Sequence, residues 1–151
     1  MSNPAATEQA LERIIRELLH RLEFVEFIVG RDGDFDLLAA STIKRCKQAI
    51  NEDNSALIWV LPYVTADFRD NEEAYQSYYD EIEICEASAE KHYKAAFQTR
   101  NRSIVDRSDL VIFCIERKQG GAYQTMRYAQ KQSKRYINIT DIEAMSDPFH
   151  L

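Results

Sequence analysis

The chain has 151 residues, of which 45% are hydrophobic. This length suffices for the core of one domain and is too short for two, so we expect a single domain over residues 1–151. The net charge of −6 argues against a broad nucleic-acid or anionic-membrane contact surface, because such surfaces carry an excess of lysine and arginine.

The predicted elements of the first half are a helix over residues 11–22 capped by Thr7, a strand over 24–30, a helix over 35–50 and a strand over 56–64. The two helices show apolar residues every three or four positions. The two strands are runs rich in aromatic and β-branched residues, which is typical of buried strands. Pro62 should end the second strand, because proline cannot donate to a central ladder.

The second half is less regular at first. NEEAYQSYYDEI is compatible with an acidic helix and IEIC with a short strand, and Ser88 would cap a long helix that runs to Val105. LVIFCI and RYINI predict two more strands around a helix over residues 122–132, whereas TDIEAMSDPFHL has no clear element. The alternation of strands and helices implies right-handed crossovers and a Rossmann-like three-layer α/β/α sandwich with a mostly parallel sheet.

The cysteines and the first residues bear on location. Cys46, Cys85 and Cys114 lack the paired spacing of a zinc site or a disulfide framework, so we expect buried, reduced thiols and a cytoplasmic protein. MSNPAATEQA lacks the basic and apolar regions of a signal peptide, and no apolar run reaches the roughly 20 residues of a membrane span. No membrane association, metal or cofactor is expected.

All four glycines lie in two turns that follow predicted strands, GRDGDFD and ERKQGGAY. Ligands of open α/β sheets bind outside the carboxyl ends of the strands, where helix N-termini present free N–H groups. Paired glycines let the backbone approach a phosphate closely, and the next two N–H groups add donors. The same glycines could serve the turn alone, because no P-loop lysine and hydroxyl accompany them.

Charged side chains near these turns have two interpretations each. Arg100 and Arg102 are either a solvated helix face or a phosphate clamp. Asp36 either complements a helix dipole or accepts from a ribose hydroxyl. His92 is expected to be structural, and no catalytic residue is assigned. The predicted ligand-binding set is Gly30, Arg31, Gly33, Asp36, Arg102, Gly120, Gly121, Ala122 and Tyr123.

Three segments, FIVGRDGDFDLLAASTI, CEASAEKHYKAAFQTRNRSIVDRSDLVIFCIE and KQGGAYQTMRYAQKQSKRYINI, together resemble the YpsA-like branch of the SLOG superfamily. This superfamily includes the Lonely-Guy phosphoribohydrolases and the DNA-processing protein A fold. The likeness covers residues 24–139 and depends on the motifs G-x-x-G-x-x-D, R-N-R-x-x-V-D-x-S-D and G-G-A-Y. It implies a Rossmann-like domain that binds a nucleotide or a nucleotide-derived ligand, with the helix acid at Asp36 and the ligand-facing basic residue at Arg102.

The sequence departs from this family in two places. Relatives begin with a strand that ends in a T-G-H-R-like turn, whereas this sequence begins with a polar tail and a helix. One wall of the pocket would then be absent, supplied by a second subunit or lost to a late start site. The hydrolases carry P-G-G-x-G-T-x-x-E, but QGGAYQTMR has Arg127 near the place of the acid. N-glycosidic cleavage is therefore less expected, because its oxocarbenium-like charge needs a carboxylate.

The sequence leaves three functions open. The first is a nucleotide-binding or sensing domain, and the second is a nucleoside-monophosphate hydrolase in which Glu116 or Asp32 supplies the missing acid. The third is an oligomeric interaction protein with a degenerate pocket. We expect a homodimer, because an exposed sheet edge invites pairing. The tyrosine-rich segment 71–83 should either pack on the sheet or form an interface.

Overall fold

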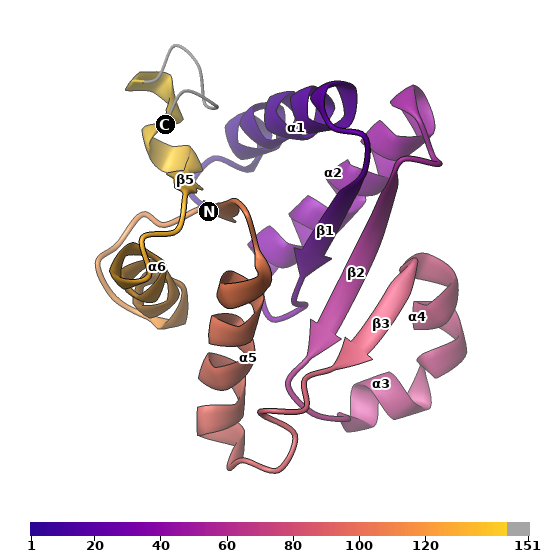
Figure 1. Cartoon of the computed structure of the whole chain (residues 1–151), viewed down its shortest axis with the longest axis vertical. Helices are drawn as coiled ribbons and strands as arrows, with labels where there is room; N and C mark the ends of the chain where they lie inside the picture. The colour runs from indigo at the N-terminus through magenta and orange to yellow at the C-terminus, as the bar shows by residue number, and fades with distance from the viewer. Residues whose placement is uncertain (145–151) are drawn as a thin grey trace.

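The computed structural model describes residues 1–144, in which helices cover both faces of parallel sheets (Figure 1). The strands are β1 (Val25–Val29), β2 (Ser55–Leu61), β3 (Glu81–Ile84), β4 (Val111–Phe113) and β5 (Tyr136–Asn138). The helices are α1 (Pro4–Arg21), α2 (Asp34–Ile50), α3 (Ala66–Asp70), α4 (Glu72–Tyr78), α5 (Tyr93–Arg107), α6 (Gly121–Lys131) and the 3-10 helix η1 (Ile139–Ala144). The order of elements confirms the predicted Rossmann-like α/β fold.

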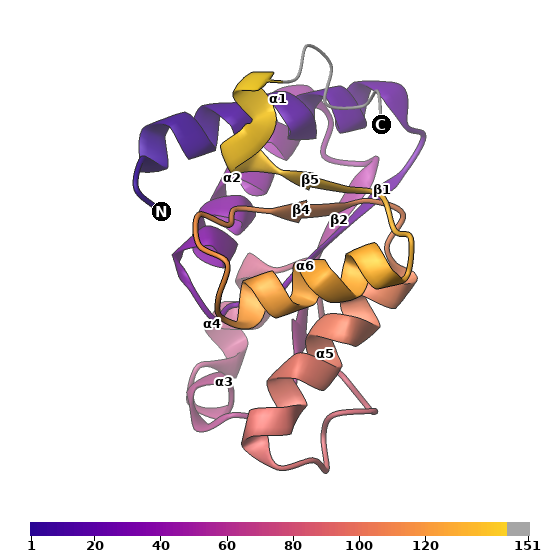
Figure 2. The same cartoon turned by 90° about the vertical axis from the view of Figure 1, so that its left-hand side faces the viewer.

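The strands form two sheets rather than one. β2 lies between β1 and β3 in the first sheet, and β4 pairs with β5 in the second. Every pair is parallel, as predicted. Figure 2 shows β4 and β5 side by side above α6. Among the described residues, β1 and β4 are each paired on one side only, so the expected single sheet is divided between them.

The hydrophobic core is divided between the two faces of the sheets. The larger part joins α1 and α2 to β1 and β2, with Ile14, Cys46 and Leu57 among its most buried members. A smaller cluster of Val105, Phe113 and Ala129 joins α5, β4 and α6. Because helices cover both faces, the chain forms the predicted three layers.

The tyrosine-rich segment packs on the sheet. The ring of Trp59 on β2 lies 4.9 Å from the ring of Tyr75 and 5.2 Å from that of Tyr79, centroid to centroid. Tyr79 is buried, and Tyr75 packs against the larger core. Of the two alternatives predicted for this segment, the structure shows the packing on the chain's own sheet.

Two helices begin at caps other than the predicted ones. α1 begins at Pro4 because the Asn3 side chain accepts the Ala6 N–H at 3.1 Å and proline suits the first helical position. Thr7, the predicted cap, is a buried residue of the helix whose hydroxyl donates to the Asn3 carbonyl oxygen. The predicted cap was therefore wrong, and Asn3 caps α1.

The second wrong cap is Ser88. His92 precedes α5 and its Nδ1 accepts the Lys94 N–H at 3.4 Å, so His92 has the structural role that the sequence predicts. Ser88 is instead buried, and its hydroxyl donates to the Pro62 carbonyl oxygen at 2.6 Å. Ser88 therefore holds the segment before α5 against the end of β2 and does not start the helix.

Two further expectations concern the cysteines and the end of the chain. All three thiols are free, with Cys46 and Cys85 buried and Cys114 half-buried. The tail without a predicted element begins with most of η1, and residues 145–151 lie outside the described part of the chain. Within residues 1–144, no helix is both long enough and apolar enough to cross a membrane.

Candidate functional site

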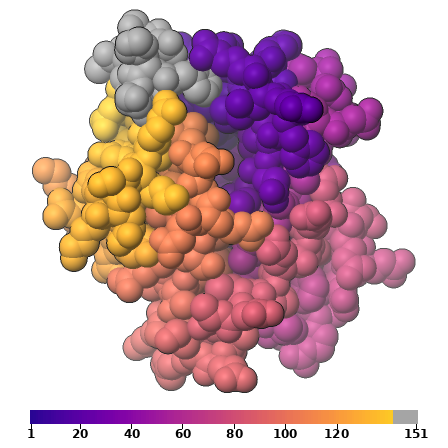
Figure 3. Space-filling view, in the orientation of Figure 1, coloured from indigo at the N-terminus to yellow at the C-terminus, as the bar shows by residue number. Residues whose placement is uncertain are grey.

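A cavity of about 750 Å³ lies between β1 and β4. Residues of α1 and α2 line it from one layer, and residues of α5 and α6 from the other. Figure 3 shows the surface hollowed between the indigo residues of α1 and the orange residues around β4. Gly30 and Gly33 after β1 line this cavity together with Gly121 after β4. The tertiary structure therefore brings the two glycine-bearing turns to one place.

Gly30 is enclosed by polar atoms. A Cβ at this position would lie 3.1 Å from Asp32 Oδ2, 3.2 Å from Arg100 Nη1 and 3.3 Å from Asp36 Oδ2. The Asp36 carboxylate also accepts the backbone N–H of Asp32 at 2.9 Å, which holds the turn between β1 and α2. Gly30 thus lets two carboxylates and one guanidinium close over the end of β1.

Arg100 is the charged residue most deeply built into the site. Its side chain on α5 is 1% exposed, its Nη1 donates to the Val60 carbonyl oxygen at 2.9 Å, and its Nη2 is paired with the Asp32 carboxylate. Its Nε donates to Asn101 Oδ1 at 3.0 Å. Arg100 therefore ties the ends of β1 and β2 to α5.

Arg102 lies on the other side of α5. Its guanidinium stands 5.3 Å from the centroid of the Tyr128 ring on α6, it is exposed, and it does not line the cavity. Arg100 and Arg102 thus lie on different sides of α5, and only Arg100 lines the cavity. The residue that sequence reasoning chose as ligand-facing is outside the cavity, and its neighbour by two positions is inside.

The Asp36 carboxyl group has a raised pKa. Burial at the start of α2 is the largest cause, and the neighbouring Asp32 charge adds to it. The hydrogen bond from the Asp32 N–H and the charge of Arg100 act in the opposite direction. Asp36 therefore takes up a proton more readily than an exposed aspartate does.

The second turn opens α6. Gly120 has φ of 93°, a left-handed conformation that favours glycine, and nothing lies within 4 Å of a Cβ placed there. Within the described residues, no side chain caps this helix end. The Gln98 amide instead donates to the carbonyl oxygen of Gly121 at 3.4 Å. The first N–H groups of α6 are thus left without a side-chain cap beside the cavity.

The nine predicted ligand-binding residues divide into two groups. Those that line the cavity are Gly30, Gly33, Asp36, Gly121 and Ala122, and those outside its lining are Arg31, Arg102, Gly120 and Tyr123. Arg31 turns towards α4, where it donates to the Tyr79 hydroxyl at 3.1 Å and lies 4.8 Å from the centre of the Tyr75 ring. Asn101, the middle residue of the R-N-R motif, also lines the cavity, although no role was predicted for it. Gln98 and Thr125 line it too, and no motif of the sequence marked them.

The two candidate acids are placed differently. Glu116 is exposed, lies outside the cavity lining, and accepts from the N–H and the hydroxyl of Ser2 at 2.8 and 2.9 Å. These two bonds lower the pKa of Glu116. Asp32 lines the cavity but is paired with Arg100. Of the two, only Asp32 lies where a cavity ligand could touch it.

Comparison with known proteins identifies no family for this chain. No family model matches the chain, and no curated protein matches its sequence. One similar solved structure is (E)-4-hydroxy-3-methyl-but-2-enyl diphosphate reductase, the terminal enzyme of the non-mevalonate pathway, with 10% identity over 87% of this chain and 52% of that chain. This chain therefore spans about half the length of that protein. The TM-score is 0.25, and a similarity at this level carries no argument about function.

Proposed function

We propose that the chain binds a nucleotide or a phosphorylated nucleoside derivative, as its resemblance to the SLOG superfamily implies. The observation that carries the proposal is the meeting of two glycine-bearing turns, from distant parts of the sequence, at one cavity. Both turns follow the carboxyl ends of parallel strands, the edge at which open α/β sheets take their ligands. Because the chemistry of the two turns differs, each turn suits a different end of the ligand.

The phosphate is assigned to the α6 turn. The uncapped N–H groups at the start of α6 are donors, and the helix dipole adds partial positive charge there. Gly121 has no side chain to keep an anion away, and Ala122 brings only a methyl group. The β1 turn is a poor place for phosphate, because Asp32 and Asp36 stand there with one guanidinium between two carboxyl groups.

The sugar or base is assigned to the β1 turn. Carboxylate oxygens accept hydrogen bonds from ribose hydroxyls and from the amino groups of bases. Asp32 is 39% exposed at its side chain, so the carboxylate keeps surface for a further donor although it is paired with Arg100. The proposed ligand thus lies across the cavity with its anionic end on α6 and its hydroxyl-bearing end on β1.

A thermal-shift screen tests this proposal. The panel contains nucleoside mono- and diphosphates, ribose 5-phosphate, free nucleosides and inorganic phosphate. A ligand at 100 times its dissociation constant stabilises the folded chain by about 2.7 kcal/mol. For a chain of this size, that gain should raise Tm by about 5–10 °C. We expect a phosphorylated nucleoside to give this shift, and the parent nucleoside to give less.

Two variants of α6 make the test specific. Gly121→Val places a branched side chain in the phosphate position and should abolish the shift. Gln124→Val adds the same residue to the same helix at an exposed position outside the cavity, and should keep the shift. A full shift in Gly121→Val would contradict the assignment of the phosphate to α6. No shift with any phosphorylated nucleoside would contradict the proposed function itself.

A hydrolase remains the second candidate from the sequence. Asp32 is the better acid of the two named, because it lines the cavity and Glu116 does not. The same nucleotide samples, assayed for free base, distinguish the two functions. If free base is released by the original chain and not by Asp32→Asn, the chain is a hydrolase. Binding of the nucleotide without release of base supports a sensor.

A further inference from the structure

The cavity is bordered by the free edges of two strands. The Val25 N–H on β1 donates to Asn54 on the β2 side, and the Val111 N–H on β4 donates to Arg135 on the β5 side, both at 3.0 Å. Successive residues of a strand direct their backbone groups to opposite sides. The N–H groups of Glu26, Ile28 and Ile112 therefore point away from the existing partners. Every residue of β1 and β4 lines the cavity, so these free groups border it.

The size of the cavity matches a short strand. A residue of a packed strand occupies roughly 160 Å³, the product of a rise of about 3.3 Å, a strand spacing of about 4.8 Å and a sheet separation of about 10 Å. A cavity of about 750 Å³ thus holds about five strand residues. β1, which forms one wall, is itself five residues long.

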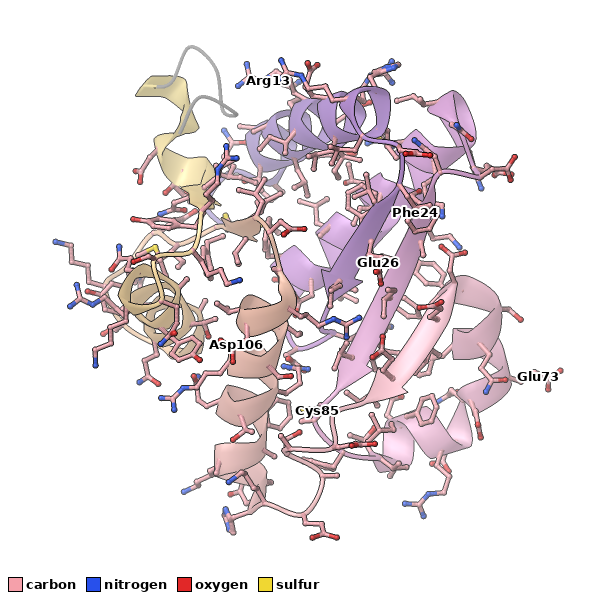
Figure 4. All side chains as sticks on the ribbon, in the orientation of Figure 1. Arg13, Phe24, Glu26, Glu73, Cys85 and Asp106 are labelled. Carbon is pink, nitrogen blue, oxygen red and sulfur yellow. The ribbon has the colours of Figure 1, made fainter. Side chains whose placement is uncertain are left out.

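The remaining walls define the chemistry of the occupant. Leu11 and Ile43 line the cavity from the layer of α1 and α2, and Phe97 and Ile104 line it from α5. A parallel strand that is covered on both faces reads as a continuous apolar run of valine, isoleucine and leucine. Glu26 projects from β1 on the side of α5, where its carboxylate lies 3.7 Å from Arg107 (Figure 4).

We propose that the cavity takes up an apolar strand of a partner polypeptide, about five residues long and parallel to β1 and β4, which joins the two sheets into one. The strand's carboxyl end would lie beside Gly30 and add a wall to the polar end of the cavity. Within residues 1–144, β1 to β5 are each already paired, and a second copy of this part of the chain could donate one of them only by unpairing it. The proposed partner is therefore a different polypeptide. This proposal stands independently of nucleotide binding.

Amide hydrogen exchange tests the proposal residue by residue. The whole chain is mixed with excess peptide of five alternating valines and isoleucines flanked by lysines. Exchange at Glu26, Ile28 and Ile112 should slow by about tenfold or more, a factor that corresponds to 1.4 kcal/mol of protection. The amides of Val25 and Val111 already donate within the sheets and serve as internal controls. Their exchange should change less.

Two controls address non-specific binding. The same peptide N-methylated at every residue keeps its charge and apolar character but cannot pair along either edge, so it should give no protection. Ala39→Phe fills part of the cavity from α2, where Ala39 is 9% exposed, and should remove the effect of the peptide while circular dichroism stays that of the folded chain.

Three outcomes would overturn the proposal. The first is unchanged exchange at the three amides with peptide in excess, and the second is equal protection by the N-methylated peptide. The third is protection in the chain alone that rises with chain concentration, since a second copy would then occupy the cavity. Failure here leaves the thermal shift with nucleotides untouched, because that shift is read out through Gly121 and not through the strand edges.

Discussion

The polar end of the cavity is a cluster in which each residue has a structural task. Gly30 makes room for the side chains, Asp36 accepts from the turn, and Arg100 binds Asp32 and the end of β2. Such a cluster fixes charges in place before any ligand arrives, which is what a preorganised site requires.

Asp36 gives a prediction about pH. Its pKa is raised in the folded chain, so the folded state binds this proton more tightly than the unfolded state does. The contribution of Asp36 to the free energy of unfolding is therefore most favourable below the ordinary pKa of 3.8. It becomes less favourable as the pH rises through the raised pKa of the folded chain. Asp36→Asn is always neutral and still offers an oxygen to the Asp32 N–H. The Tm of this variant, relative to the original chain, should rise between pH 3 and pH 7.

Differential scanning fluorimetry across this pH range measures the effect. The original chain serves as the reference at every pH, so the titration of other carboxyl groups cancels in the difference. A difference in Tm that stays constant between pH 3 and pH 7 would show that burial does not raise the pKa of the Asp36 carboxyl group.

At the scale of elements, the ends of helices decide which groups reach the cavity. α2 and α6 both begin after a strand with a glycine as N-cap, Gly33 and Gly120. The two glycines differ in backbone conformation, however. Gly33 has φ of −163°, an extended conformation open to any residue, whereas Gly120 has φ of 93°. Only the α6 turn therefore depends on glycine for its backbone conformation.

This difference predicts opposite sensitivities. Gly120→Ala should lower the free energy of unfolding by about 1–3 kcal/mol, because its φ of 93° with ψ of 178° is a conformation adopted almost only by glycine. Gly33→Ala should change it by less than about 0.5 kcal/mol, because the reduced entropy of the unfolded chain offsets a slightly poorer cap. Urea denaturation of both variants is the measurement. Equal losses in the two would contradict the assignment of conformational strain to Gly120 alone.

At the scale of the whole molecule, α5 contacts both sheets, and Arg100 anchors it to the first of them. The β1 and β4 sheets are separate, and α5 lies in the sequence between β3 and β4. Through Arg100, α5 holds the ends of β1 and β2 while Val105 on the same helix packs with Phe113 of β4. The side chain that shapes the cavity's polar end thus anchors α5, which also packs on β4, to the first sheet.

Replacement of Arg100 should lower the free energy of unfolding. Arg100→Met leaves the Val60 carbonyl oxygen and the Asp32 carboxylate without their partner. We expect a loss of about 3 kcal/mol, near the lower end for a broken buried ion pair, because Asp32 stays partly hydrated. The matched control, Arg102→Met, loses a stacking contact with Tyr128 on the exposed face and should cost at most about 1 kcal/mol.

Urea denaturation of the two arginine variants compares them directly. If both variants lose the same free energy of unfolding, Arg100 does not anchor α5 to the ends of β1 and β2 in the way that its contacts indicate. A larger loss in Arg102→Met would also contradict this role.

The sequence by itself determined the alternation of strands and helices, because periodicity and glycine turns are local properties of the chain. It also marked the two turns that border the cavity. Only the tertiary structure decided that Arg100 faces the cavity and Arg102 does not, since helical phase depends on which side of α5 packs on the sheet. The gap between β1 and β4 could likewise not be predicted from the sequence, because the pairing of strands distant in sequence is set by long-range packing rather than by any local pattern.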